Sequence, residues 1–248
     1  MRFFSLIAIA GACLVSCAPQ KRSPEDAVLV AKSYAELEWM PEARHIRHGK
    51  DSKGIIVHTP DKSLSAHTDD KRGWWQPGKP ATGMAYKWGG FDTPESFLAG
   101  LKAGKKAGDV ANSYKVRNDN AVVSEESVGI DCSGFVSRCW GLDRHVSTKD
   151  LPGICEPVGW GELRKGDILL KNGHVLMFLT YQDSFVIGYE AGPIPTWRAR
   201  ICAIHVDYLK KNDYAPWRYR LMDEPAADAE TKYYDIDFSR EQWRMGPY

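Results

Sequence analysis

The sequence predicts an α+β fold, in which a helix that begins at a cysteine packs on an antiparallel sheet. Residues 129–141 support the helix: Asp131 is a residue type that favours helix N-caps, and the apolar residues after it recur at helical spacing. Asn172-Gly173 supports the sheet, because this pair is a strong two-residue hairpin turn between apolar runs. A third apolar run, 185–189, follows another polar turn, so we expect consecutive antiparallel strands.

The chain divides into four expected parts. Residues 1–16 have the pattern of an export signal, and 17–82 are expected to be a tether followed by a helical and loop segment. The main domain is expected at 83–221 with an insertion at about 91–128, and a tail follows at 222–248.

Residues 23–41 predict a first helix, since they open with Ser-Pro-Glu-Asp, carry apolar residues at helical spacing and end at Met-Pro. We expect this helix to pack one face on the main body. Residues 93–104 predict a second helix that opens with Thr-Pro-Glu. Between the two helices, Ile55–His58 is a strand candidate within mostly loop sequence. The charged stretch 105–128 is expected to be a long surface excursion.

Composition limits the function classes. The 33 Lys+Arg and 32 Asp+Glu residues give a formal net charge of +1, whereas nucleic-acid binders usually carry a clearly basic face. We therefore expect no nucleic-acid partner. Hydrophobic residues make up 43% and charged residues 26%, which is typical of a globular protein. The sequence has no CxxC pair, so no metal site is expected.

The N-terminal segment points to export and a lipid anchor. Apart from Ser5, Phe3 to Val15 is an apolar run of about 13 residues, too short to span a bilayer, which takes about 20. Ser16-Cys17 follows, and a small residue before Cys at this place resembles the lipobox of bacterial lipoproteins. The resemblance implies that Cys17 is lipidated and that the chain is anchored in a membrane. Because Ala18 rather than Asp follows, it implies the periplasmic face of the outer membrane. An ordinary signal peptide with an incidental Cys is the alternative.

Cys132 is the candidate nucleophile. In the first turn of a helix a thiol lies at the positive end of the helix dipole, which lowers its pKa toward the thiolate form. The free N–H groups there can also stabilise the negative oxygen of a tetrahedral intermediate. A small core residue is the alternative, but Asp131, Ser133 and Gly134 are unusual neighbours for a core helix start.

Three segments together resemble the NlpC-type family of papain-like cell-wall endopeptidases. Asp131–Phe135 stands where that family has its nucleophile, and Tyr86–Gly90 resembles its aromatic-plus-glycine element. Leu163–Ile168 followed by His174 resembles the strand pair that carries its histidine. The three cover roughly 83–195, under half of the chain. The resemblance implies a papain-like domain, attack by a thiolate and a thioester acyl-enzyme; many members cut between D-glutamate and a diamino acid in peptidoglycan stem peptides.

His174 is the candidate proton partner of the thiol, and a third residue is expected to orient its ring. If the turn is symmetric about Asp183, residue 174 pairs with 192 and 176 with 190, so Glu190 shares a sheet face with His174. A register change of one residue would present Tyr189 instead. The family usually has His, Asn or Gln at this place, so an acidic residue departs from its pattern. We predict Glu190.

The resemblance also implies that Tyr86, Trp88, Asp131 and Ser133 line the substrate cleft. In relatives that act on trimmed stem peptides, the tyrosine and the aspartate help to bind a free amine. For Asp131, helix capping alone is the alternative. The connection from Gly90 to the nucleophile is longer than the family usually has, and it forms either a lid over the cleft or a surface decoration.

The sequence thus predicts an exported cysteine peptidase of cell-wall stem peptides that uses no cofactor. One alternative is a related cysteine amidase or acyltransferase, which passes the acyl group to an acceptor other than water. Another is a non-catalytic wall-binding lipoprotein with a relic site. Cys139 is expected to pack in the core. Cys155 and Cys202 are either core thiols or a disulfide formed in an oxidising periplasm.

Overall fold

The computed structural model describes residues 21–62, 73–192 and 197–224. The expected export signal, Cys17 and all but the first residues of the expected tail lie outside these ranges. No helix in the described ranges is long and apolar enough to cross a membrane.

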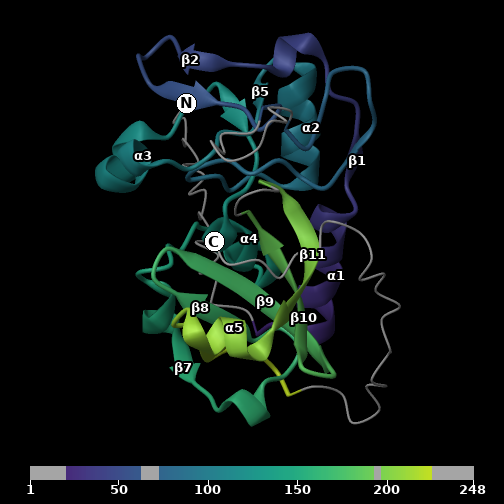
Figure 1. Cartoon of the computed structure of the whole chain (residues 1–248), viewed down its shortest axis with the longest axis vertical. Helices are drawn as coiled ribbons and strands as arrows, with labels where there is room; N and C mark the ends of the chain where they lie inside the picture. The colour runs from purple at the N-terminus through teal and green to yellow at the C-terminus, as the bar shows by residue number, and fades with distance from the viewer. Residues whose placement is uncertain (1–20, 63–72, 193–196, 225–248) are drawn as a thin grey trace, which may run out of the picture.

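A six-stranded sheet forms the centre of the main domain (Figure 1). Its strand order is β11-β10-β9-β8-β12-β7, and every neighbouring pair is antiparallel. The α+β class with an antiparallel sheet is therefore confirmed. The strands are β7 (Cys155–Pro157), β8 (Ile168–Lys171), β9 (His174–Gln182), β10 (Phe185–Ala191), β11 (Ala199–His205) and β12 (Ala215–Tyr219).

Helices cover both faces of this sheet (Figure 1). Helices α1 (Pro24–Ala35) and α4 (Cys132–Cys139) lie on one face and share a buried core with the sheet, in which the Tyr34 and Phe135 rings meet edge to face. Helix α5 (Val206–Lys211) lies on the other face above Leu176 and Phe178. The first helix thus packs on the main body as predicted, although it ends at Ala35 and not near residue 40.

The hairpin that presents His174 forms as predicted. Strand β8 ends at Lys171, Asn172-Gly173 makes the turn with Gly173 at a φ of 79°, and His174 pairs with Lys171 at the start of β9. Because Gly adopts positive φ without steric cost, the turn is tight and fixes which residue begins the strand.

A β-bulge sets the register of the next hairpin. The turn after β9 has two residues, and Phe185 pairs with Gln182, one residue away from the predicted register. The register then shifts between Ile187 and Gly188, after which Gly188 pairs with Phe178 and residue 189 with 177. The predicted turn was wrong, but the bulge restores the predicted register beyond it. A side chain at Gly188 would meet a carbonyl at 2.3 Å, so glycine permits this close approach.

The segments around the insertion form the upper part of the molecule in Figure 1. Their short ladders join β1 to β4, β2 to β3 and, in parallel, β5 to β6. The elements are β1 (Glu38–Trp39), β2 (His48–Lys50), β3 (Ile56–His58), β4 (Ala81–Thr82), α2 (Pro94–Lys102), β5 (Lys106–Ala107), α3 (Ser113–Asn118) and β6 (Ser127–Val128), with short 3-10 turns η1 (Ala43–His45), η2 (Asp119–Val122), η3 (Leu151–Ile154) and η4 (Trp160–Glu162). The strand candidate at Ile55–His58 and the helix at 93–104 are confirmed.

The expectation that 105–128 is a surface excursion holds only in part, since exposed residues of α3 lie beside buried ones. Asp109, Lys115, Ser124, Ser127 and Val128 are all buried. The segment returns through parallel pairing of β6 with β5, and its polar groups are satisfied within the fold. One charged pair of the stretch, Asp109 with Lys115, lies in the interior, which sequence composition does not show.

The last strand and the thiols complete the description of the sheet. Strand β12 lies between β8 and β7, and β7 forms the edge of the sheet. Cys155 is on β7 and Cys202 on β11, at opposite edges of the sheet, so the disulfide alternative is wrong. Cys139 is fully buried in the main core, as expected.

Asp109 gives the fold a testable pH dependence. Its carboxylate and the Lys115 ammonium form an ion pair whose side chains are both 0% exposed. Burial raises the pKa of Asp109 to about 6, although Lys115 opposes this shift. The folded state therefore holds this proton more tightly than the unfolded chain, where the pKa is about 3.8. The stabilising contribution is complete below about pH 4 and is lost as the pH rises to about 6.

Urea unfolding at pH 4 to 7 measures this contribution. Relative to Asp109→Asn, the free energy of unfolding of the unaltered protein is expected to fall by on the order of 1–3 kcal/mol across that window. The comparison uses the slope with pH, because Asp109→Asn also leaves Lys115 without its anion and lowers stability throughout. Parallel pH profiles for the two proteins would contradict the account.

Candidate active site

Cys132 is the first residue of α4, and Asp131 caps the helix as predicted. The Gly134 backbone N–H donates to the Asp131 carboxylate over 2.6 Å. This fixes the start of the helix, so the thiol lies in its first turn, where backbone N–H groups have no partner within the helix. The residue is 6% exposed.

The aromatic-plus-glycine element supports the start of α4. Tyr86 pairs with Ile130 in a bridge, and the Asp131 backbone N–H donates to the Gly90 carbonyl over 3.2 Å. A side chain at Gly90 would meet the Gly129 carbonyl at 2.5 Å, so only glycine lets the two segments approach this closely. Two of the three segments singled out from the sequence therefore meet at the nucleophile candidate.

The surroundings of the Cys132 sulfur oppose its ionisation in the resting site. Burial and the Asp131 carboxylate raise the pKa of the thiol, while the backbone N–H groups of Val175, Ser133 and Cys132 itself lie against the sulfur and pull the pKa down. Burial wins. The prediction of a depressed thiol pKa is therefore wrong for the resting site, because the helix position was weighed without the desolvation of a sulfur packed against a sheet.

His174, Glu190 and Arg200 form a connected buried group. The His174 Nε2 atom lies 3.0 Å from Glu190 Oε2, and the other carboxylate oxygen, Oε1, accepts hydrogen bonds from Arg200 Nε at 3.0 Å and Nη2 at 2.7 Å. The Glu190 side chain is 2% exposed and His174 8%. Glu190 faces Arg200 directly across the β10–β11 ladder, so the strand register holds all three groups in line.

Glu190 stays ionised despite its burial. Burial alone would raise the pKa of Glu190, but Arg200 and His174 outweigh it and hold the pKa below its ordinary value. An ionised carboxylate only accepts hydrogen bonds, so it requires the proton of the imidazole on Nε2. The lone pair of the neutral ring is then on Nδ1.

The bulge decides that Glu190, and not Tyr189, meets the histidine. Beyond it, alternate residues of β10 point to opposite faces: Glu190 lies on the face of His174, and Tyr189 packs into the core on the other face with Met177. Of the two candidates that the sequence left open, Glu190 and not Tyr189 contacts His174.

The start of β9, next to His174, reaches the Cys132 thiol through its backbone. The paired part of β9 and β10 ends at residues 177 and 189, and just beyond it the Val175 backbone N–H points at the Cys132 sulfur. Within the described ranges, the His174 ring bonds to Glu190 rather than to the thiol. Tyr214 packs edge to face against the ring with centroids 6.2 Å apart, which restricts its rotation. Catalytic contacts are often long without substrate and tighten when it binds.

The candidate cleft residues have different surroundings. Tyr86 is buried; its ring packs edge to face on Trp197 at 5.0 Å, and burial, with Cys132 and Asp131 nearby, raises the pKa of its hydroxyl, so it remains a proton donor. Trp88 is half-buried in the same aromatic cluster. The Ser133 hydroxyl donates to Asp131 over 3.0 Å, so both residues are already engaged in the fold.

Three residues of the site were missed by sequence reasoning. Arg200 would have been found by pairing a strand at 199–205 with 185–191, but the sequence gives that strand no clean alternation. Trp197 has a φ of 42°, and its carbonyl accepts the Tyr86 N–H over 2.8 Å, a backbone role that no residue type reveals. His145 follows Gly141 in a loop, and no sequence pattern relates it to the nucleophile.

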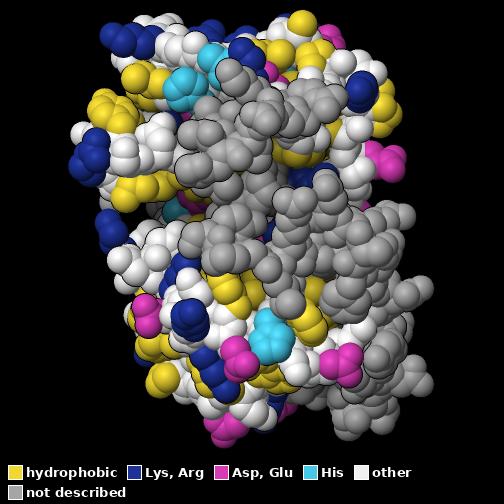
Figure 2. Space-filling model, viewed as in Figure 1, with side chains coloured by type: hydrophobic (Ala, Val, Ile, Leu, Met, Phe, Trp, Pro, Cys, Tyr) yellow, Lys and Arg dark blue, Asp and Glu magenta, His cyan; other side chains and the backbone are white. Residues whose placement is uncertain are grey.

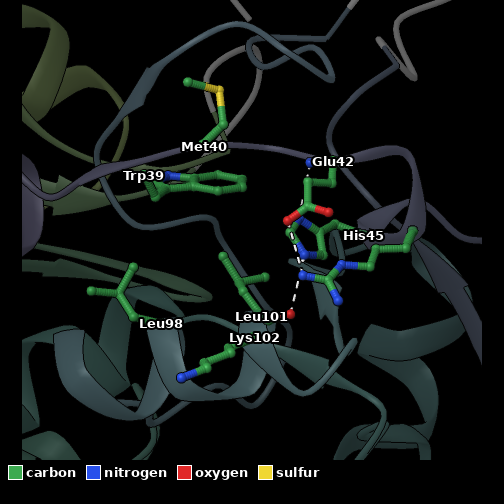
Figure 3. A pocket seen from close by; sticks show the side chains of 8 residues that line it. Trp39, Met40, Glu42, His45, Leu98, Leu101 and Lys102 are labelled. Carbon is green, nitrogen blue, oxygen red and sulfur yellow. Dashed lines mark hydrogen bonds and ion pairs between the residues drawn. The ribbon is translucent and has the colours of Figure 1, made fainter.

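A hollow of about 240 Å³ lies elsewhere, between β1 and η1 on one side and α2 on the other (Figure 3). Its wall includes His45, whose ring nitrogens bond to the Glu42 backbone N–H at 3.0 Å and the Leu101 carbonyl at 3.2 Å. These contacts tie η1 to α2, so the histidine holds the fold together at this place. The hollow shares no lining residue with the Cys132 group.

The described ranges contain no cluster of three or more His, Cys, Asp or Glu side chains that could hold a metal ion. Figure 2 shows Lys and Arg side chains as well as Asp and Glu side chains on the described part of one face, in keeping with the near balance of charge. No protein-family model matches the sequence, and comparison with curated proteins finds no similar one.

Proposed function

We propose that this protein is a cysteine peptidase of papain-like type that hydrolyses stem peptides of the bacterial cell wall. The observation that carries the proposal is the buried Arg200–Glu190–His174 group at the sheet end, where the backbone beside His174 contacts the Cys132 sulfur. A helix-borne thiol, an imidazole and a carboxylate that orients the ring are the parts that thiol-based acyl transfer needs.

In the proposed reaction His174 acts through Nδ1, since Glu190 holds the proton on Nε2. Nδ1 takes the Cys132 proton as the sulfur bonds to the carbonyl carbon, which suits a thiol that burial keeps protonated at rest. The negative oxygen is stabilised by N–H groups at the start of α4. The imidazolium then protonates the leaving amine, which leaves a thioester. Water, losing its proton to Nδ1, cleaves the thioester and restores the thiol.

Glu190 stabilises the imidazolium in both halves of the reaction. Because Arg200 holds the second carboxylate oxygen, Glu190 cannot rotate away from the ring without breaking two hydrogen bonds. The carboxylate therefore fixes the tautomer in which Nδ1 is the basic nitrogen of the ring.

The substrate class follows from the resemblance of three segments to the NlpC-type family and from the N-terminal sequence. An export signal with Cys17 in a lipobox-like setting would deliver the chain to the compartment that contains peptidoglycan. Within this proposal Tyr86 and Trp88 form an aromatic wall of the cleft, and the bond cut lies between D-glutamate and a diamino acid.

Mass spectrometry of purified stem peptides, before and after incubation with the mature protein, tests the proposal. Two fragments that divide the peptide after D-glutamate, with one water added in total, are the expected result. Adducts with added amines in place of water would instead identify an acyltransferase. Unchanged peptides would contradict the proposed hydrolysis.

A further inference from the structure

The loop after α4 folds back on the N-terminus of the same helix. The backbone N–H of Val146 donates to the Ser137 hydroxyl over 3.1 Å, which ties the loop alongside the helix. His145 is thereby held against the cap, with Nε2 2.9 Å from both carboxylate oxygens of Asp131 and 3.3 Å from the Ser133 hydroxyl. Gly134 makes room for it, because a Cβ there would lie 2.9 Å from His145 Cδ2.

This arrangement places the His145 imidazole against the carboxylate of Asp131, the residue that directly precedes the nucleophile candidate. Asp131 accepts hydrogen bonds from the Gly134 N–H at 2.6 Å and from the Ser133 hydroxyl at 3.0 Å. A fixed negative charge beside a thiol disfavours the thiolate. A cation on the far side of that carboxylate offsets the charge and removes part of this penalty.

The other groups around His145 do not place a positive charge against the Asp131 carboxylate as directly as the imidazole does. The Phe91 ring meets the imidazole edge to face at 6.1 Å, and the Arg138 guanidinium lies over that ring at 3.5 Å while donating to the Phe91 carbonyl. Asp143 and Arg144 precede His145 in its loop and are exposed, so solvent screens them. The imidazole, in contrast, contacts both carboxylate oxygens and is partly shielded.

We propose that His145 is a positioning residue that holds the Asp131 carboxylate in its capping geometry and, when protonated, balances its charge, so that it sets the reactivity of the Cys132 thiol. The inference rests on Cys132 being the nucleophile of the proposed function, and it adds a regulator to that site. The Cys132 thiol is then more reactive when the His145 imidazole is protonated than when it is neutral.

Alkylation by iodoacetamide tests this inference without any peptide substrate. The second-order rate at Cys132 is measured by peptide mass spectrometry at pH 5.5 and pH 9, where an imidazole is ordinarily protonated and neutral, respectively. In His145→Gln, which keeps a donor but has no charge, the rate at pH 5.5 is expected to be about 3–10-fold lower than in the unaltered protein. At pH 9 the two rates are expected to agree within about twofold, since both side chains are then neutral.

Two further variants separate charge from shape. His145→Lys keeps a cation at both pH values, so its rate at pH 5.5 is expected to stay near that of the unaltered protein. His48→Gln is the matched control: His48 Nε2 lies 3.1 Å from Asp61 in a similar pair within the β2–β3 hairpin region, and no effect is expected. Thermal unfolding of each variant shows that it is folded.

Equal rates for folded His145→Gln and unaltered protein at pH 5.5 would overturn the inference. So would a loss in His145→Lys as large as that in His145→Gln, because it would show that ring shape and not charge matters. These outcomes are independent of hydrolysis: a failure of the proposed function appears as uncut stem peptides, whereas a failure of the inference appears in the alkylation rates alone.

Discussion

His174→Ala is expected to lower the rate of stem-peptide hydrolysis by at least about 10³-fold, as when one member of a catalytic unit is removed. The reason is specific to this site. Burial raises the pKa of the Cys132 thiol, so the sulfur needs a base at the moment of attack, and the helix N-terminus alone does not supply one. The rate is measured as fragment formed per unit time by mass spectrometry.

His205→Ala is the matched control for this variant. His205 is on β11 and partly exposed, and its Nδ1 accepts the Asp207 N–H over 3.1 Å, outside the group around Glu190. Its activity is expected to stay within about twofold. A double variant, Cys132→Ala with His174→Ala, is expected to be no slower than either single variant, because the two residues act in one step. Retention of activity in His174→Ala would remove the imidazole from the mechanism.

Glu190→Ala is expected to slow hydrolysis by at least about 10²-fold, since the variant has no side-chain group that stabilises the imidazolium or fixes the tautomer. It also leaves Arg200, whose side chain is 15% exposed, without its anion, so we expect a loss of stability of about 3–5 kcal/mol. Because the nucleophile itself is untouched, Cys132 should still react with iodoacetamide. Turnover is measured as for His174→Ala, and stability is measured by urea unfolding.

Tyr189→Phe is the control for strand register. Tyr189 is buried on the opposite face of β10 from Glu190, so removing its hydroxyl is expected to change hydrolysis by less than about threefold. Full activity in Glu190→Ala together with a large loss in Tyr189→Phe would show that the third residue is wrongly assigned. A loss in both would indicate damage to the sheet rather than to the site.

The local parts of the site could be predicted from the sequence because each has a local physical signal. Asp131 is an N-cap with a hydrogen bond to Gly134, and Asn172-Gly173 is a two-residue turn that fixes the start of a strand at His174. These signals involve a few consecutive residues. They require no knowledge of what packs against them.

The remaining parts depend on packing between distant segments. The contact of Glu190 with His174 depends on the bulge between Ile187 and Gly188. The prediction that Glu190 shares a sheet face with His174 was therefore right, although the turn from which it was derived was wrong. Arg200 and His145 come from a strand and a loop whose positions follow from tertiary pairing. The direction of the thiol pKa was predicted incorrectly because desolvation depends on what lies over the sulfur, which no motif reports.

The most direct test of the central claim compares the unaltered protein with Cys132→Ala on purified stem peptides under identical conditions. The side chain of Cys132 is small and lies at the helix start, so the variant is expected to fold, and thermal unfolding checks this. We predict cleavage by the unaltered protein and a rate at least about 10³-fold lower for the variant. Cleavage by folded Cys132→Ala at the rate of the unaltered protein would contradict the assignment of this thiol as the nucleophile.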